Sequence, residues 1–147
     1  MNSHIRKTNQ IIWKPGSHLA ADEVMVPFDG RTKEKTFIPT KPNSTGLKVW
    51  AVAQGSFRIT WNFHTPGEGK GPVDTQVPIE LGGGTGKGNK TQAVVVKMMD
   101  QLPQPPLDHP PLYHLFLDNL FTSTRFLVYM RDTRRIGLQE RPDLTLA

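Results

Sequence analysis

The chain has 147 residues, 18 lysines and arginines against 13 aspartates and glutamates, a formal net charge of +5, and no cysteine. This length predicts one basic domain with one hydrophobic core, and the absence of cysteine excludes disulfides and thiolate metal sites. We expect no membrane partner, because no apolar run approaches the ~18–20 residues of a membrane helix and the N-terminus lacks the apolar stretch of a signal peptide.

The first half of the chain predicts three β-strands, because apolar and polar residues alternate in three segments: residues 19–28, 46–53 and 57–63. The alternation is clearest between Phe57 and Phe63, where four apolar side chains fall on one face of the strand. The sequence Gln54-Gly55-Ser56 predicts a tight hairpin between the second and third strands. These features together indicate an antiparallel meander.

The segment at residues 31–48, which connects the first predicted strand to the second, is basic. Five cations share it with one opposing carboxylate, Glu34: Arg31, Lys33, Lys35, Lys41 and Lys48. A local positive field of this kind suits the phosphates of nucleic acid. The alternative is a solvated basic hairpin without any ligand, since small basic surfaces are common.

Glycine and proline are concentrated after the third strand, where residues 66–88 hold 11 of them. We expect a structureless loop here, inserted at about residues 64–88. Beyond it the apolar period changes to that of a helix, for which Asn89 or Thr91 offers the N-cap and Pro103 the stop.

The last part of the chain predicts one more strand and one more helix. The nearly continuous apolar run at residues 112–117 is typical of a strand buried on both faces. Thr122 then offers an N-cap hydroxyl for the second helix. The resulting order of strand, strand, strand, helix, strand, helix indicates an α/β fold with a mixed sheet covered by helices.

Two aspartates occupy positions where a charge is unexpected. Asp22 lies within the first strand, and Asp118 directly follows the buried run. A charge beside a buried strand is costly unless it is paired or binds a metal. If the first and fourth strands are neighbours, the two carboxylates meet and suit Mg²⁺ or Mn²⁺. The alternatives are a helix cap for Asp118 and an exposed strand-end charge for Asp22.

Three segments of the chain follow one another in an order shared with one protein family. Residues 19–31 read LAADEVMVPFDGR, residues 38–50 carry Ile38-Pro39 and Lys41-Pro42 before GLKVW, and residues 116–123 read FLDNLFTS. They resemble, in turn, the segment around the first catalytic aspartate, the basic link with the second strand, and the segment of the second catalytic aspartate of piggyBac-type transposases and their transposable-element-derived relatives.

The resemblance implies an RNase H-like mixed sheet flanked by helices. It implies metal-dependent DNA cleavage and strand transfer, in which three aspartates hold two divalent cations, Mg²⁺ or Mn²⁺. Asp22 and Asp118 match the first two of these ligands, with catalytic and metal-binding roles. DNA as partner, pairing of two copies and nuclear location are expected on the same ground.

The resemblance also implies that the catalytic set is incomplete. The family's third aspartate lies well beyond the second, and this sequence ends at Ala147 before reaching it. We therefore expect a flanking segment at residues 1–17, a partial catalytic domain at residues 18–147 whose sheet is incomplete at its C-terminal end, and weak metal binding. Whether the chain is a fragment of a longer product is left open by the sequence.

Three interpretations follow. The first is a transposase-derived catalytic domain with Asp22 and Asp118 as metal ligands. The second is a non-catalytic DNA-binding relic or co-opted module that uses the basic segment at residues 31–48 on phosphates. The third is a truncated product without a retained role, unable to fold because strands of its sheet are missing.

Overall fold

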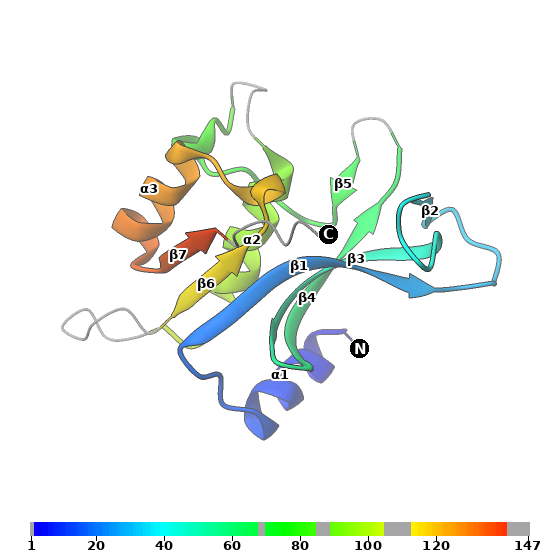
Figure 1. The fold of residues 1–147 in the computed structure, drawn as a ribbon, viewed down its shortest axis with the longest axis horizontal. Coiled ribbons are helices and arrows are strands. Elements are labelled where there is room, and N and C mark those ends of the chain that lie inside the picture. Colours follow the sequence, from blue (N-terminus) through cyan, green and yellow to red (C-terminus); the bar gives the residue numbers. More distant parts are fainter. Residues whose placement is uncertain (1, 68–69, 85–88, 105–112, 141–147) are drawn as a thin grey trace, which may run out of the picture.

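The chain folds into a mixed sheet with helices packed against it, as a computed structural model shows (Figure 1). The structure describes residues 2–67, 70–84, 89–104 and 113–140. The helices are α1 (Asn2–Ile12), α2 (Lys90–Asp100) and α3 (Thr124–Arg134), with short 3₁₀ turns η1 (Ile79–Leu81) and η2 (Asn119–Phe121). The strands are β1 (His18–Pro27), β2 (Lys35–Phe37), β3 (Thr45–Gln54), β4 (Phe57–Thr65), β5 (Gly71–Pro72), β6 (His114–Leu117) and β7 (Gly137–Glu140).

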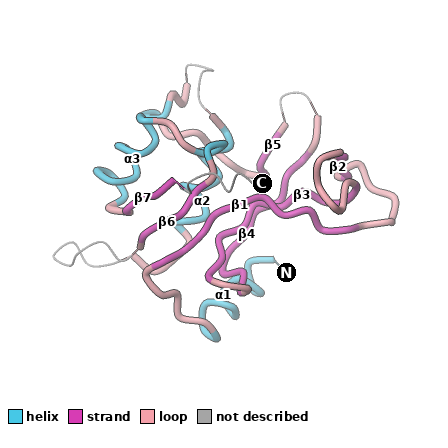
Figure 2. The backbone as a smooth tube through the Cα atoms, in the orientation of Figure 1, coloured by secondary structure: helices cyan, strands magenta, loops and turns pink. Residues whose placement is uncertain are grey.

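The strands lie in the order β5-β4-β3-β1-β6-β7, with β2 paired to β3. Neighbours β1, β3 and β4 are antiparallel, whereas β6 is parallel to β1 and β7 is parallel to β6. In Figure 2 the strands run through the middle of the molecule, with α1 beside β4 and α3 beside β7. The predicted mixed α/β sheet is confirmed, and β1 and β6, the first and fourth of the predicted strands, are neighbours.

The hairpin between β3 and β4 forms as predicted, because Gly55 adopts the positive φ of 58° that the two-residue turn needs. The buried face of β4, however, differs from the apolar pattern. Thr60 and Asn62 are buried and Phe63 is 41% exposed. The register of β3 and β4 shifts between Val52 and Ala53, and the buried polar groups have partners: Asn62 Nδ2 donates to the carbonyl of Val73 at 2.9 Å.

The two long helices of the second half begin at local caps. Asn89 is the N-cap of α2, and its side chain accepts from the Thr91 N–H at 2.8 Å. The predicted N-cap of α3 was wrong by one residue, since Ser123 is extended and its hydroxyl accepts from the Phe126 N–H at 3.2 Å. The hydroxyl of Thr122 instead donates to the Asn119 carbonyl, which closes η2.

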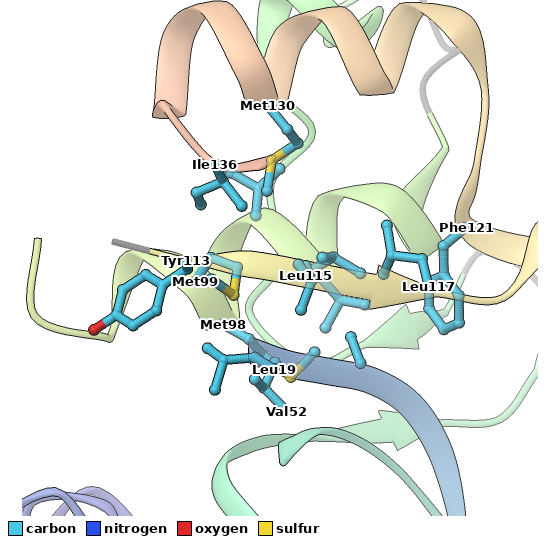
Figure 3. Close-up of a cluster of buried hydrophobic side chains, with 14 of the residues drawn as sticks. Leu19, Val52, Met98, Met99, Tyr113, Leu115, Leu117, Phe121, Met130 and Ile136 are labelled. Carbon is cyan, nitrogen blue, oxygen red and sulfur yellow. The ribbon is translucent and has the colours of Figure 1, made fainter. Parts of the chain in front are cut away.

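A single hydrophobic core lies between the sheet and the helices α2 and α3 (Figure 3). Leu115 and Leu117 on β6 and Leu19 on β1 are each at most 1% exposed. They pack with buried side chains from the two helices, among them Met98, Met99, Phe126 and Met130. The core therefore fixes β1, which contains Asp22, against β6, which directly precedes Asp118.

Two segments are more structured than expected. The predicted loop at about 64–88 contains the end of β4, strand β5 and turn η1, whose Leu81 is buried in the core. Residues 2–12 of the predicted flanking segment form α1, and Arg6 on this helix donates to Gln101 Oε1 at 3.0 Å. Within the described ranges, no helix is long and apolar enough to cross a membrane.

Candidate metal and nucleic-acid site

Asp22 lies within β1, and Asp118 directly follows the neighbouring strand β6. The last parallel pair of these strands is Ala21 with Leu117, and each aspartate is the next residue of its own chain segment. Paired strands are about 4.8 Å apart, and residues at matching positions share a face of the sheet. Ala21 and Leu117 are buried in the core. The alternation within β1 therefore puts Asp22 on the opposite face of the sheet, and Asp118 comes at the corresponding point after β6.

The backbone around each aspartate holds its carboxylate in place. The Glu23 N–H donates to Asp22 Oδ1 at 2.7 Å, and the Asn119 N–H donates to Asp118 Oδ1 at 2.6 Å. The second contact makes Asp118 the N-cap of η2, so the cap predicted as an alternative is present. A carboxylate offers about four lone-pair sites, so one N–H leaves capacity for a metal.

Asp22 is not the strand-end charge considered as an alternative, because it lies inside β1 opposite Ala51 of β3 and is half-buried. Asp118 is exposed. Carboxylates are hard oxygen donors, and their chemistry fits a divalent cation of the Mg²⁺ or Mn²⁺ type, which commonly takes one or two carboxylates together with water and phosphate oxygens. Among the described residues, no group of three or more histidine, aspartate or glutamate side chains is arranged to hold a metal.

The five predicted DNA-binding cations separate into two sets. Arg31 and Lys33 are exposed on the connection between β1 and β2, and Lys35 is the half-buried first residue of β2. Lys41 and Lys48 instead pair with Glu23, at 3.5 Å and 2.6 Å. The Lys48 ammonium also lies 4.3 Å from the centre of the Trp50 ring. Arg31, Lys33 and Lys35 therefore lie close together along the chain, whereas Lys41 and Lys48 form ion pairs with Glu23.

Glu23 is the residue that the sequence reasoning missed. Its side chain is 15% exposed, and it lies on the same face of β1 as Leu19 and Ala21. Burial raises the pKa of its carboxyl, but the hydrogen bonds and charges of Lys48 and Lys41 outweigh this and hold the pKa below its usual value. The alternation of β1 puts Glu23 on the same face as the buried Leu19 and Ala21, and this unexpected charge is the feature by which the sequence could have revealed it.

His64 is a second group near this ion pair. Its ring lies edge-on to Trp50, with centroids 6.0 Å apart. Burial and the nearby Lys48 lower the pKa of His64, so the ring is neutral at pH 7. Its Nδ1 is buried without a hydrogen-bond partner among the described residues.

Comparison with known proteins identifies the family to which this chain belongs. A family model described as Transposase IS4 matches residues 1–137. The human PiggyBac transposable element-derived protein 3 is 31% identical over 111 residues, which cover 76% of this chain and 16% of that protein. The human Chimeric ERCC6-PGBD3 protein is also 31% identical over 111 residues, which cover 76% of this chain and 9% of that protein. The chain belongs to the piggyBac-type transposase family.

A solved structure shares the fold. One chain of the cryo-EM structure of the piggyBac transposase synaptic complex with hairpin DNA superposes with a TM-score of 0.62 and 20% sequence identity, over 90% of this chain and 24% of that chain. The match agrees with the expected RNase H-like sheet. The chain spans less than a quarter of the length of each of these relatives.

Proposed function

We propose that this chain forms part of a transposase-like domain that binds DNA and holds a divalent cation, Mg²⁺ or Mn²⁺, through Asp22 and Asp118. The observation that supports the proposal is the parallel register of β1 and β6, whose last pair, Ala21 with Leu117, directly precedes Asp22 and Asp118 in the sequence. The proposal includes nuclear location and pairing of two copies on DNA, for which the family resemblance is the support.

The residues of the chain would act by positioning. Asp22 is fixed by its place inside β1 and by the Glu23 N–H, and Asp118 is fixed by capping η2. A divalent cation bound there supplies charge stabilisation for the attacking and leaving oxygens of a phosphodiester. Because the described residues provide two acidic ligands to this site, we expect weak metal binding and slow or absent turnover.

Removing either carboxylate is expected to weaken Mn²⁺ binding at least about tenfold, because changes even outside the first ligands of a metal commonly cost this much. The measurement is a Mn²⁺ titration followed by electron paramagnetic resonance, on the wild type, Asp22→Asn and Asp118→Asn. Asp132→Asn is the matched control, since Asp132 is exposed on α3 and pairs with Arg131. Equal Mn²⁺ affinity in all four proteins would contradict the proposed site.

Catalytic competence is tested separately with supercoiled plasmid DNA and Mn²⁺. Nicking by the wild type that disappears in Asp22→Asn and Asp118→Asn, but not in Asp132→Asn, would support a catalytic role. DNA binding without nicking would support the second interpretation, a non-catalytic DNA-binding module. That alternative is favoured by one observation, the exposed cations Arg31 and Lys33 on the β1–β2 connection.

The double variant Arg31→Ala/Lys33→Ala is expected to bind duplex DNA more weakly and with a smaller salt dependence. Each phosphate contact contributes about 0.9 to the slope of the logarithm of affinity against the logarithm of salt concentration, so the slope should fall by up to about 2. Arg125→Ala is the control, because Arg125 is exposed on α3, beside the opposite end of the sheet. Fluorescence anisotropy at several salt concentrations gives the slopes. An unchanged slope in the double variant would remove these residues from the DNA contact.

A further inference from the structure

A groove of about 300 Å³ lies at the end of the sheet where the β1–β2 connection meets β3, β4 and the segment leading away from β5. Phe28, Leu47, Phe63 and Val73 provide its apolar walls. This volume is at the small end of the range for ligand pockets, roughly 300–1,000 Å³. The groove therefore suits one flat ring system better than a large ligand or a helix.

Two walls of the groove are held by hydrogen bonds and close packing. The Val73 N–H donates to the Phe63 carbonyl at 2.9 Å, and the Val73 carbonyl accepts from Lys97 Nζ at 2.8 Å and from Asn62 Nδ2 at 2.9 Å. Across the groove, the Phe28 ring lies against Gly30, where an added Cβ would come within 2.4 Å of a ring atom. The shape of the groove is thus built into the fold.

The groove combines partly exposed aromatic rings with polar groups. Phe28, which directly follows β1, is 38% exposed, and Phe63, which lies in β4, is 41% exposed. Lys48 and the neutral His64 also line the groove. Flat faces for stacking and a few hydrogen-bonding groups are what a nucleobase requires, since base–aromatic stacking works with any base.

The charge around the groove suits the backbone of a nucleic acid. The surrounding residues 23–48 carry five basic side chains against three carboxylates, Glu23, Asp29 and Glu34. Glu34 lines the groove, and Arg31 and Lys33 are exposed on the same connection. A phosphate backbone would follow these cations while one base enters the groove.

We propose that this groove binds an unpaired nucleobase of single-stranded DNA, with Phe28 and Phe63 as stacking partners. The inference rests on the proposed DNA-binding function and specifies which DNA that function uses. A base within a duplex is stacked on both faces and paired along one edge, so it cannot enter a groove of this size. The groove therefore gives the chain a preference for unpaired over duplex DNA that its cations alone would not provide.

The experiment uses the full chain and two fluorescent probes of equal length, a 16-nucleotide oligo-dT and a 16-base-pair duplex. Phe63→Leu keeps an apolar side chain but loses the flat ring, and we expect it to weaken oligo-dT binding about tenfold or more while leaving duplex binding unchanged. Phe63→Trp should retain oligo-dT binding. Phe37→Leu is the matched control, because Phe37 is 67% exposed on β2 and is not part of the groove wall.

A second measurement locates the base directly. Oligo-dT carrying 5-iododeoxyuridine should cross-link on irradiation, and peptide mapping should find the adduct at Phe28 or Phe63. Thermal melting by circular dichroism verifies that each variant is folded. If Phe63→Leu melts early, Phe63→Trp and the cross-link still test the groove.

The outcomes separate the two proposals. If the wild type binds duplex but Phe63→Leu leaves oligo-dT binding unchanged, or lowers both affinities equally, the groove proposal is overturned and the proposed DNA binding stands. If the wild type binds neither probe, both are overturned. If oligo-rU binds as tightly as oligo-dT and Phe63→Leu weakens both equally, the groove binds any single strand, and the proposed specificity for DNA is overturned. Cross-links confined to residues outside the groove would also overturn it.

Discussion

Leu115→Ala is expected to lower the free energy of unfolding by about 4 kcal/mol, within the ~2–5 kcal/mol typical of buried leucines cut to alanine. Leu115 is 0% exposed in the middle of β6, paired with Leu19 of β1 and Leu138 of β7. It belongs to the same core cluster as Met99 of α2 (Figure 3). These neighbours come from two strands and a helix, so they cannot close the cavity by moving one element.

Urea unfolding followed by circular dichroism measures this loss, with the free energy extrapolated linearly to water. Leu120→Ala is the control, since Leu120 is 50% exposed on η2 and should change stability by less than about 1 kcal/mol. A loss below about 1 kcal/mol in Leu115→Ala would contradict the described core. A wild type without a cooperative transition would instead support the third interpretation, a chain that does not fold.

The strands of the fold could be predicted from sequence where their own residues determine them. The alternation in β4 and the apolar run of β6 are local patterns, and both give strands at the expected places. The two aspartates could also be singled out from the sequence, because a charge next to a buried strand stands out and the order of elements indicated a mixed sheet. In the parallel register, Asp22 and Asp118 each come one residue after the last pair, Ala21 with Leu117.

Other elements depend on contacts that the sequence does not reveal. Strand β7 has the sequence GLQE and forms by pairing with β6, which is far away along the chain. Helix α1 even reverses the usual pattern: its polar Arg6 and Gln10 face the protein through Gln101, while Ile11 and Ile12 are 79% and 70% exposed. No periodicity argument would have predicted this orientation, because it places the apolar side outward.

The ion-pair partner of two lysines in the basic segment also could not be predicted from the sequence. In the sequence, Glu34 is the only acidic residue in the segment that contains Lys41 and Lys48, residues 31–48. In the fold, Glu23 is opposite Trp50 on β3, and Lys48 lies two residues along the same strand and on the same face. The partner of these lysines therefore comes from the antiparallel register, and the distance along the chain hides it.

Glu23→Gln is expected to cost about 3 kcal/mol of unfolding free energy, at the lower end of the ~3–5 kcal/mol for breaking a buried ion pair. Both Glu23 and Lys48 keep only about 15% of their side-chain surface exposed, so the loss of one charge leaves the other poorly solvated. The lower end applies because Lys41, the second partner, is 36% exposed. The combination Glu23→Gln/Lys48→Met should recover part of the loss, since it removes the unpaired ammonium together with its partner.

The pH dependence gives an independent test of the same pair. The Lys48 and Lys41 charges hold the pKa of Glu23 below its usual value in the folded chain. Above its usual pKa, near 4.5, the carboxyl is ionised in both states and its stabilisation is complete. As the pH falls, the unfolded chain takes up the proton first, so the stabilisation is lost as the pH approaches the folded-state pKa. The difference in stability between wild type and Glu23→Gln should therefore be constant from pH 6 to 7 and shrink below about pH 4.5.

Urea unfolding at a series of pH values measures this difference directly. Glu34→Gln is the matched control, because Glu34 is an exposed carboxylate on the β1–β2 connection, and its substitution should give a small difference at every pH. A Glu23→Gln difference that stays constant down to pH 3 would show that the carboxylate charge is not what stabilises β1 against β3. In that event the double variant with Lys48→Met would recover nothing, and the rigidity of the strand that carries Asp22 would have to come from the core packing of Leu19 and Ala21 alone.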